Sequence, residues 1–406
     1  MNRNLTSVFA LACGALVANL YYSQALIGLI APDIGLAPRA AGLVVTLTQL
    51  GYGSGLLLIV SLADLVENRK LALVMLSGVV LSLIGVATSH SAPVFLVFSF
   101  LTGFCCVGAQ ILIPFAAHLA TDENRGRVVG NIMGGLVAGI MLARPAASFL
   151  AASFGWRAIF WVSAAGMVAL GVLLYRMLPE RRPKTTLHYG QILKSTVGLL
   201  FTQPVIRRRA AYQATLFASF NLFWTATPLF LAQRFGFGQR GIALFALAGA
   251  GGALAAPISG RLADRGYIRS GTAAALVAAI VAFLVAGWSG VAGILVILAA
   301  AAILLDGATQ YNQVTTQRVI YSISPEARGR ITSIFMTCVF LGGATGSSLA
   351  PVVLIKGGWQ GMSLVGAAMV TAALLLFLTE RQSQGRTHAL RSNTESGSGT
   401  SMRQSA

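Results

Sequence analysis

Long apolar segments, each able to cross a lipid bilayer, follow one another along this 406-residue chain. A bilayer-spanning helix needs about 20 apolar residues. Runs bounded by proline, glycine or charge lie approximately at 6–30, 40–63, 71–89, 92–119, 127–152, 157–177, 210–233, 240–264, 269–288, 291–319, 330–354 and 359–379. The pattern predicts an all-α polytopic membrane protein with twelve transmembrane helices.

The composition excludes several other classes of protein. Only 10% of the residues are charged, against about a quarter in soluble domains. The net charge of +18 comes from basic residues scattered between apolar runs, so we expect no nucleic-acid partner. The four cysteines lie inside apolar runs without disulfide or zinc spacing, so we expect neither a metal nor a cofactor.

The basic residues also predict the orientation. With the N-terminus inside, 23 of the 29 lysines and arginines fall on the cytoplasmic side, five fall on the other side, and Arg144 lies within a span. Positively charged loops stay in the cytoplasm. We therefore expect both termini to be cytoplasmic. The bias towards glycine, alanine and arginine indicates a bacterial source, and hence the inner membrane.

The two parts of the chain repeat each other. Leu62-Ala63-Asp64 matches Leu262-Ala263-Asp264 at an offset of 200 residues, and Arg125-Gly126-Arg127 matches Arg328-Gly329-Arg330 at an offset of 203. Parallel repeats are typical of secondary transporters that bind substrate between their halves. We therefore predict two six-helix halves.

The predicted boundaries place the N-terminal half at 1–178 and the C-terminal half at 210–380. Residues 179–209 form a cytoplasmic linker, in which the apolar residues from Tyr189 to Phe201 favour one helical face. That segment is either an interfacial helix or a plain connection. Residues 381–406 are rich in Ser, Gly, Thr and Gln, which predicts a disordered tail.

Polar residues recur in every third span and predict a central cavity. Polar groups within hydrocarbon must face water, substrate or one another. The first, fourth, seventh and tenth spans supply the substrate-binding candidates, which are Asn19, Tyr22, Gln24, Gln110, Asn221, Trp224, Gln310 and Gln313. Trp224 and Tyr22 either stack on a flat or cationic substrate or serve packing.

The tenth span carries the most informative residue. Asp306, Thr309, Gln310, Gln313 and Gln317 follow helical spacing along one stripe. Asp306 is the one acidic residue of the sequence that falls near the middle of a span. An intramembrane carboxylate that meets both sides in turn can load and release a proton. We expect Asp306 to couple transport to protons, the alternative being a structural carboxylate bonded to neighbouring polar side chains.

Arg144, beside Pro145, is the second intramembrane charge. It is either a functional group, as an anion ligand or the partner of a carboxylate, or a structural residue whose head reaches the interface.

The loops resemble those of the major facilitator superfamily. Gly260-Arg261-Leu262-Ala263-Asp264-Arg265-Gly266 is similar to that family's loop motif, and Leu62 to Lys70 keeps its Asp and its basic pair. The resemblance implies a cytoplasmic latch of Asp64, Arg69, Asp264 and Arg265, the alternative being ordinary helix-end charges. Gly130, Gly135 and Gly139 keep the small-residue face of the proton-driven antiporters' fifth span, although Arg144 stands where proline is usual.

The resemblance implies a secondary transporter that works by alternating access. We expect it to export a small organic molecule or drug in exchange for protons, as a monomer and without enzymatic activity. The alternative on the same scaffold is a proton-coupled importer of a sugar, organic acid or other nutrient. A remote alternative is an integral membrane enzyme, which would need a convergent catalytic set.

Overall fold

The computed structural model describes residues 3–183, 188–249, 251–252, 261, 265, 267–324 and 327–380, and every regular element in these ranges is helical. The first half comprises α1 (Arg3–Ala18), α2 (Tyr22–Ala25), α3 (Ile27–Asp33), the short η1 (Pro38–Ala40), α4 (Leu43–Leu62), α5 (Asn68–Thr88), α6 (Ala92–Cys106), α7 (Gly108–Leu119), α8 (Arg125–Phe154) and α9 (Arg157–Met177). The rest comprises α10 (Tyr189–Thr202), α11 (Pro204–Phe235), α12 (Gln239–Gly249), α14 (Ile268–Ala292), α15 (Leu295–Tyr321) and α16 (Arg328–Leu378).

The observed helices do not correspond one to one with the expected membrane spans. Nine helical stretches of the described residues are long and apolar enough to cross a membrane. The first span is broken into α1, α2 and α3, and α16 covers two spans that meet at Gly358, whose φ is 61°. The eighth span begins with α12, and most of its continuation lies outside the described residues. The predicted all-α polytopic fold is confirmed.

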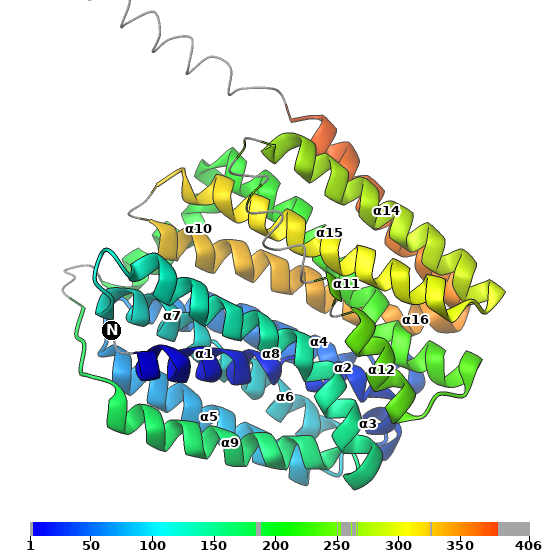
Figure 1. The fold of residues 1–406 in the computed structure, drawn as a ribbon, viewed down its shortest axis with the longest axis horizontal. Coiled ribbons are helices and arrows are strands. Elements are labelled where there is room, and N and C mark those ends of the chain that lie inside the picture. Colours follow the sequence, from blue (N-terminus) through cyan, green and yellow to red (C-terminus); the bar gives the residue numbers. More distant parts are fainter. Residues whose placement is uncertain are drawn as a thin grey trace, which may run out of the picture.

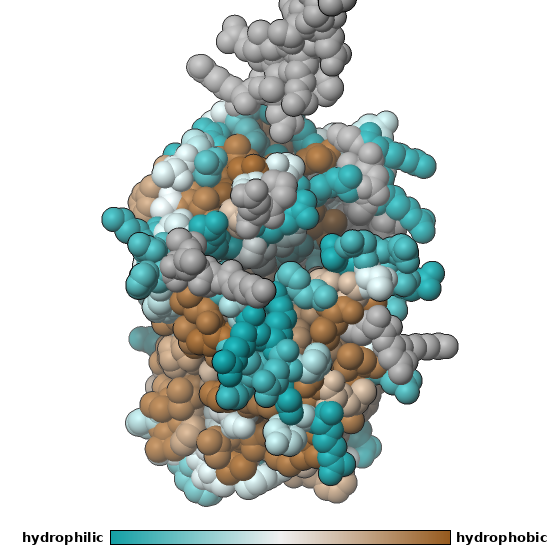
Figure 2. Space-filling model, turned by 90° about the vertical axis from the view of Figure 1, so that its left-hand side faces the viewer, coloured by the Kyte–Doolittle hydropathy of each residue, from teal (hydrophilic) through white to brown (hydrophobic). Residues whose placement is uncertain are grey.

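The spans form two bundles that lie side by side, with α1–α9 in one and α11–α16 in the other (Figure 1). We call the end that carries the start of α1, the start of α11 and the end of α16 the terminal end, and the opposite end the distal end. Figure 2 faces the terminal end and shows hydrophilic side chains gathered across it.

Small residues allow close helix contacts at equivalent places in the two bundles. Gly14 of α1 packs on Gly135 and Gly139 of α8, so that a Cβ on any of the three would clash with backbone. Gly342 and Gly346 of α16 pack in the same way on the backbone of α11. Such backbone approach is the usual basis of helix association in membranes.

The bundles also contact each other along α4 and α16. The Thr46 hydroxyl donates to the Ala344 carbonyl at 3.3 Å, and the Thr337 hydroxyl donates to the Gly53 carbonyl at 3.1 Å. At the distal half, α2 and α3 pack on α11, and α8 packs on α12. At the terminal end, α10 packs on both α4 and α16.

Candidate substrate and proton site

Arg144 of α8 lies buried at the contact between the bundles, with 6% of its surface exposed. Its Nε donates to Gln24 Oε1 of α2 at 2.9 Å. The guanidinium carbon lies 4.6 Å from the centroid of Trp224 and 5.0 Å from that of Tyr21, and Phe220 is a third aromatic neighbour. Aromatic faces attract a cation, so these rings partly compensate for the loss of hydration.

Asp306 of α15 meets the same cluster through Trp224. The indole Nε1 of Trp224 donates to Asp306 Oδ1 at 2.7 Å. The residue is buried, and Gly252 packs against its Cβ. One aromatic side chain therefore contacts both intramembrane charges, which lie on opposite bundles.

A layer of amides and hydroxyls completes the cluster. Gln24 Nε2 donates to Asn221 Oδ1 and Thr225 Oγ1, each at 3.2 Å, and Gln49 Nε2 donates to the same Asn221 oxygen at 3.2 Å. Thr225 Oγ1 in turn donates to Ser347 Oγ at 3.4 Å. This network joins α2 and α4 of the first bundle to α11 and α16 of the second.

Two polar atoms of this cluster lack partners among the described residues. Among the described residues, Arg144 Nη2 and Gln49 Oε1 are buried without a hydrogen bond. Within the same residues, Arg144 forms no ion pair at 4.0 Å or less. Buried polar groups are normally satisfied, so unmet donors and acceptors beside an intramembrane charge mark a place where a ligand can bind.

The structure brings together three of the eight residues predicted to bind substrate. Gln24, Asn221 and Trp224 belong to the cluster, whereas Gln110 of α7 donates to the Tyr52 hydroxyl at 3.2 Å, outside the hydrogen bonds of the cluster.

The remaining predicted residues lie elsewhere. Asn19 accepts from Ser163 of α9 at 2.7 Å, and Tyr22 packs edge-on against Phe160 of that helix. Gln313 donates to Met336 Sδ at 3.2 Å with its own Oε1 unpaired, and Gln310 is half-buried on α15.

The predicted latch is only partly described. Asp64 follows α4 at the terminal end, where the positive charges of Arg330 and Arg181 act on its carboxylate. Arg69 instead donates to the Tyr175 carbonyl at 2.6 Å within its own bundle. Arg265 is exposed, and Asp264 lies outside the described residues.

The distal end carries a separate ion pair. Arg157 Nη1 and Trp156 Nε1 both donate to Asp33 Oδ2, at 2.6 and 3.1 Å, and Arg157 Nη2 donates to the Ser89 carbonyl at 2.9 Å. The hydrogen bond from Arg157 holds the pKa of Asp33 below its usual range. These bonds tie the end of α3 to the start of α9.

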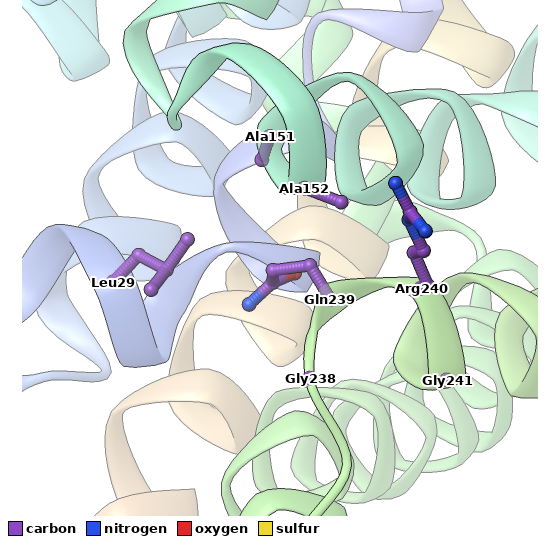
Figure 3. Close-up of a pocket in the computed structure, with 7 residues that line it drawn as sticks. All are labelled: Leu29, Ala151, Ala152, Gly238, Gln239, Arg240 and Gly241. Atoms are coloured by element: carbon purple, nitrogen blue, oxygen red, sulfur yellow. The ribbon is translucent and has the colours of Figure 1, made fainter.

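A shallow pocket of about 410 Å³ also opens between the bundles at the distal end. Figure 3 shows its lining, in which Leu29, Ala151 and Ala152 of the first bundle face the 238–241 segment of the second. None of the predicted site residues lines it. The described residues hold no group of three His, Cys, Asp or Glu side chains that would bind a metal ion.

Sequence reasoning missed Gln49 and Ser347 as members of the polar cluster, and Tyr21 and Phe220 as neighbours of Arg144. An amide in the middle of a predicted span was the available signal for Gln49. For the two aromatic residues there was none, because apolar rings are ordinary in a membrane helix.

Comparison with known proteins agrees with this fold. The chain matches the Major Facilitator Superfamily over residues 8–311 and 244–400. It is 38% identical over 374 residues to the uncharacterized transporter YgaY of Escherichia coli O157:H7, covering 92% of this chain and 94% of that protein. It is 27% identical over 259 residues to a chloramphenicol resistance protein of Pseudomonas aeruginosa, covering 60% of each chain.

Among solved structures, a D-xylose–proton symporter superposes with a TM-score of 0.75 at 15% identity, covering 92% of this chain and 97% of that one. This likeness concerns the fold alone. The family match over most of the sequence and the 38% identity to YgaY, together with the helical two-bundle fold, show the family: the chain belongs to the major facilitator superfamily of membrane transporters.

Proposed function

We propose that this chain is a proton-coupled secondary transporter of a small organic molecule, and that Asp306 binds the proton. One observation carries the proposal: a buried carboxylate on one bundle is linked through Trp224 to a buried cation on the other. A proton neutralises a carboxylate in hydrocarbon and changes its attraction to a nearby cation. Proton binding can therefore bias how the two bundles meet.

Alternating access gives the polar cluster its role in the proposal. Gln24, Gln49 and Arg144 come from the first bundle, whereas Asn221, Trp224 and Asp306 come from the second. Rocking of the bundles about this layer would open it to each side in turn. Gln110, Gln310 and Gln313 then line the path, and the chain works as a monomer in a bacterial inner membrane with both termini in the cytoplasm.

Export in exchange for protons is one direction, supported by the similarity to a chloramphenicol resistance protein. Uptake together with protons is the second, and the unpaired Nη2 of Arg144 favours it. A vacant cationic donor fits an organic anion, and an anion and a proton together keep the site neutral.

Both the coupling and its direction can be measured in proteoliposomes loaded with a pH-sensitive dye. Chloramphenicol, tetraphenylphosphonium, xylose and gluconate are added outside in turn. If substrate enters in exchange for protons, protons leave and the pH of the lumen rises. If substrate enters together with protons, the pH of the lumen falls. Asp306→Asn should abolish this proton movement while downhill substrate exchange continues. Asp122→Asn, which alters an exposed carboxylate paired with Arg125, should behave as the wild type.

Uphill transport driven by a pH gradient in the Asp306→Asn variant would contradict the assignment of Asp306 as the proton carrier.

A further inference from the structure

We propose that Arg144 binds the anionic group of the transported molecule, so that the cargo is a small organic acid. The inference rests on the transport function proposed above and adds the chemistry of the cargo. The observation that supports it is that Nη2 of Arg144, a strong and buried hydrogen-bond donor, has no acceptor within the described residues.

No carboxylate of the described residues forms an ion pair with Arg144. Its Nε meets the neutral oxygen of Gln24, and three aromatic rings cover its faces. A guanidinium remains charged at every accessible pH and binds carboxylates through two parallel hydrogen bonds. Burying such a charge without an anion is costly, so the vacant Nη2 is suited to a carboxylate supplied from outside.

Asp306 does not fill this place. Its Oδ1 is occupied by the Trp224 N–H, and no ion pair joins Arg144 to a carboxylate among the described residues. Tyr21 of the first bundle and Asp306 of the second are the titratable groups whose charges act on Arg144. The indole of Trp224 contacts both charged groups, and Nη2 of Arg144 remains without an acceptor among the described residues.

The position of the site explains how a ligand would reach it. Arg144 belongs to the first bundle, whereas Phe220 and Trp224, which cover it, belong to the second. Parting of the bundles therefore removes this cover. The unpaired Oε1 of Gln49, in the adjoining amide network, provides an acceptor for a hydroxyl or amino group on the same molecule.

Charge balance then links the acid to the proton. When Asp306 is ionised, it offsets the charge of Arg144 at a distance. When the organic anion is bound, a proton on Asp306 restores neutrality in the low-dielectric site. The anion and the proton thus favour each other's binding, which is the thermodynamic condition for co-transport.

The test uses the purified full-length protein and calorimetric binding of three matched probes: benzoate, benzenesulfonate and the uncharged benzamide. We expect both anions to bind at pH 7 and benzamide not to bind. Arg144→Gln should weaken anion binding on the order of tenfold to a hundredfold, as expected for a lost charge-assisted hydrogen bond. Arg144→Lys should retain part of it.

Arg209→Gln is the matched control, because Arg209 is another buried arginine, bonded to Thr272 of α14 away from the cluster. It should bind the anions as the wild type does, and thermal unfolding of each variant verifies its fold. Equal binding of benzamide, unchanged binding by Arg144→Gln, or the absence of anion binding to the wild type would each overturn the proposal.

The pH dependence separates this inference from the proton-carrier role. Benzenesulfonate stays ionised from pH 8 to pH 6, and its affinity for the wild type should rise over that range, whereas Asp306→Asn should show a constant affinity. Binding that depends on Arg144 but not on pH would reject Asp306 as the proton carrier and leave the anion site standing.

Discussion

The carboxylate of Glu67, in the loop between α4 and α5, caps the first turn of α5. It accepts from the backbone N–H groups of Arg69 and Lys70 at 2.7 and 2.8 Å, and from that of Arg181 at 3.2 Å. One side chain therefore starts a helix and holds the chain that leaves α9. Burial acts to raise the pKa of Glu67, but the backbone hydrogen bonds from Lys70, Arg181 and Arg69 outweigh it, so this pKa lies below its ordinary value.

Glu67→Gln should lower the free energy of unfolding by about 1 kcal/mol at pH 7, the usual value of a cap. A depressed pKa contributes stability above the unfolded-state pKa of about 4.3, and this contribution is lost as pH falls through the folded-state pKa. The gap in unfolding temperature between variant and wild type should therefore close as the pH falls below 4. Glu123→Gln, at an exposed position, should show no gap, and a gap that persists in acid would exclude this role.

The intramembrane charges show what one sequence can reveal about a site. Asp306 and Arg144 stand out because charge is rare within apolar runs. Gln24 and Trp224 were predicted to bind substrate, but their contacts with Arg144 were not predicted, since these contacts join residues 120 and 80 positions apart in the chain. Only the packing of the bundles brings these groups together.

At the scale of the element, the expected first span is interrupted at Asn19, where its polar residues begin. α1 ends at Ala18, and α2 begins at Tyr22. The Asn19 side chain donates to the Ala15 carbonyl at 2.8 Å, so it competes with the backbone N–H that would continue the helix. Hydropathy predicted a continuous helix because it measures the length of an apolar segment and contains no information about such local hydrogen bonds.

The glycine contact between α1 and α8 makes an element-scale prediction. Gly139→Ala places a methyl group against the Gly14 backbone, which must push the helices apart and should cost about 1–3 kcal/mol. Thermal unfolding in detergent measures this loss.

Gly130 is the matched control on the same helix, since a Cβ there meets no atom within 4 Å. Gly130→Ala should leave stability unchanged or raise it by about 0.5–1 kcal/mol, because alanine favours helix. Equal effects at the two positions would mean that the close approach of α1 and α8 does not determine stability.

At the scale of the whole molecule, the internal repeat predicted two bundles, and the structure shows the glycine contacts recurring in both. What the repeat could not predict is how the bundles meet. The distal contacts of α3 on α11 and the terminal packing of α10 against α4 and α16 join different parts of the chain, and matching segments within the two halves do not predict such contacts.

Asp64 at the terminal end leads to a prediction about the transport cycle. Its charged neighbour Arg330 belongs to the other bundle, so their attraction favours the arrangement in which the terminal ends meet. Asp64→Asn should slow transport severalfold in proteoliposomes and leave equilibrium substrate binding intact. Asp122→Asn serves as the exposed control at the same end. Complete loss of binding in Asp64→Asn would show that the residue supports the fold instead.

The hydroxyl bonds between α4 and α16 have a consequence for the speed of conformational change. Thr46 Oγ1 also lies 2.9 Å from the Gly42 carbonyl of its own helix, and Thr337 Oγ1 lies 2.8 Å from that of Ser333. Each of these two threonine hydroxyls can therefore leave the opposite bundle and keep an acceptor, so neither is left without a partner in hydrocarbon as the surfaces slide. At Thr46 and Thr337, sliding of the two bundles past each other therefore exchanges one hydrogen bond for another, and these contacts add little to the activation barrier of the conformational change.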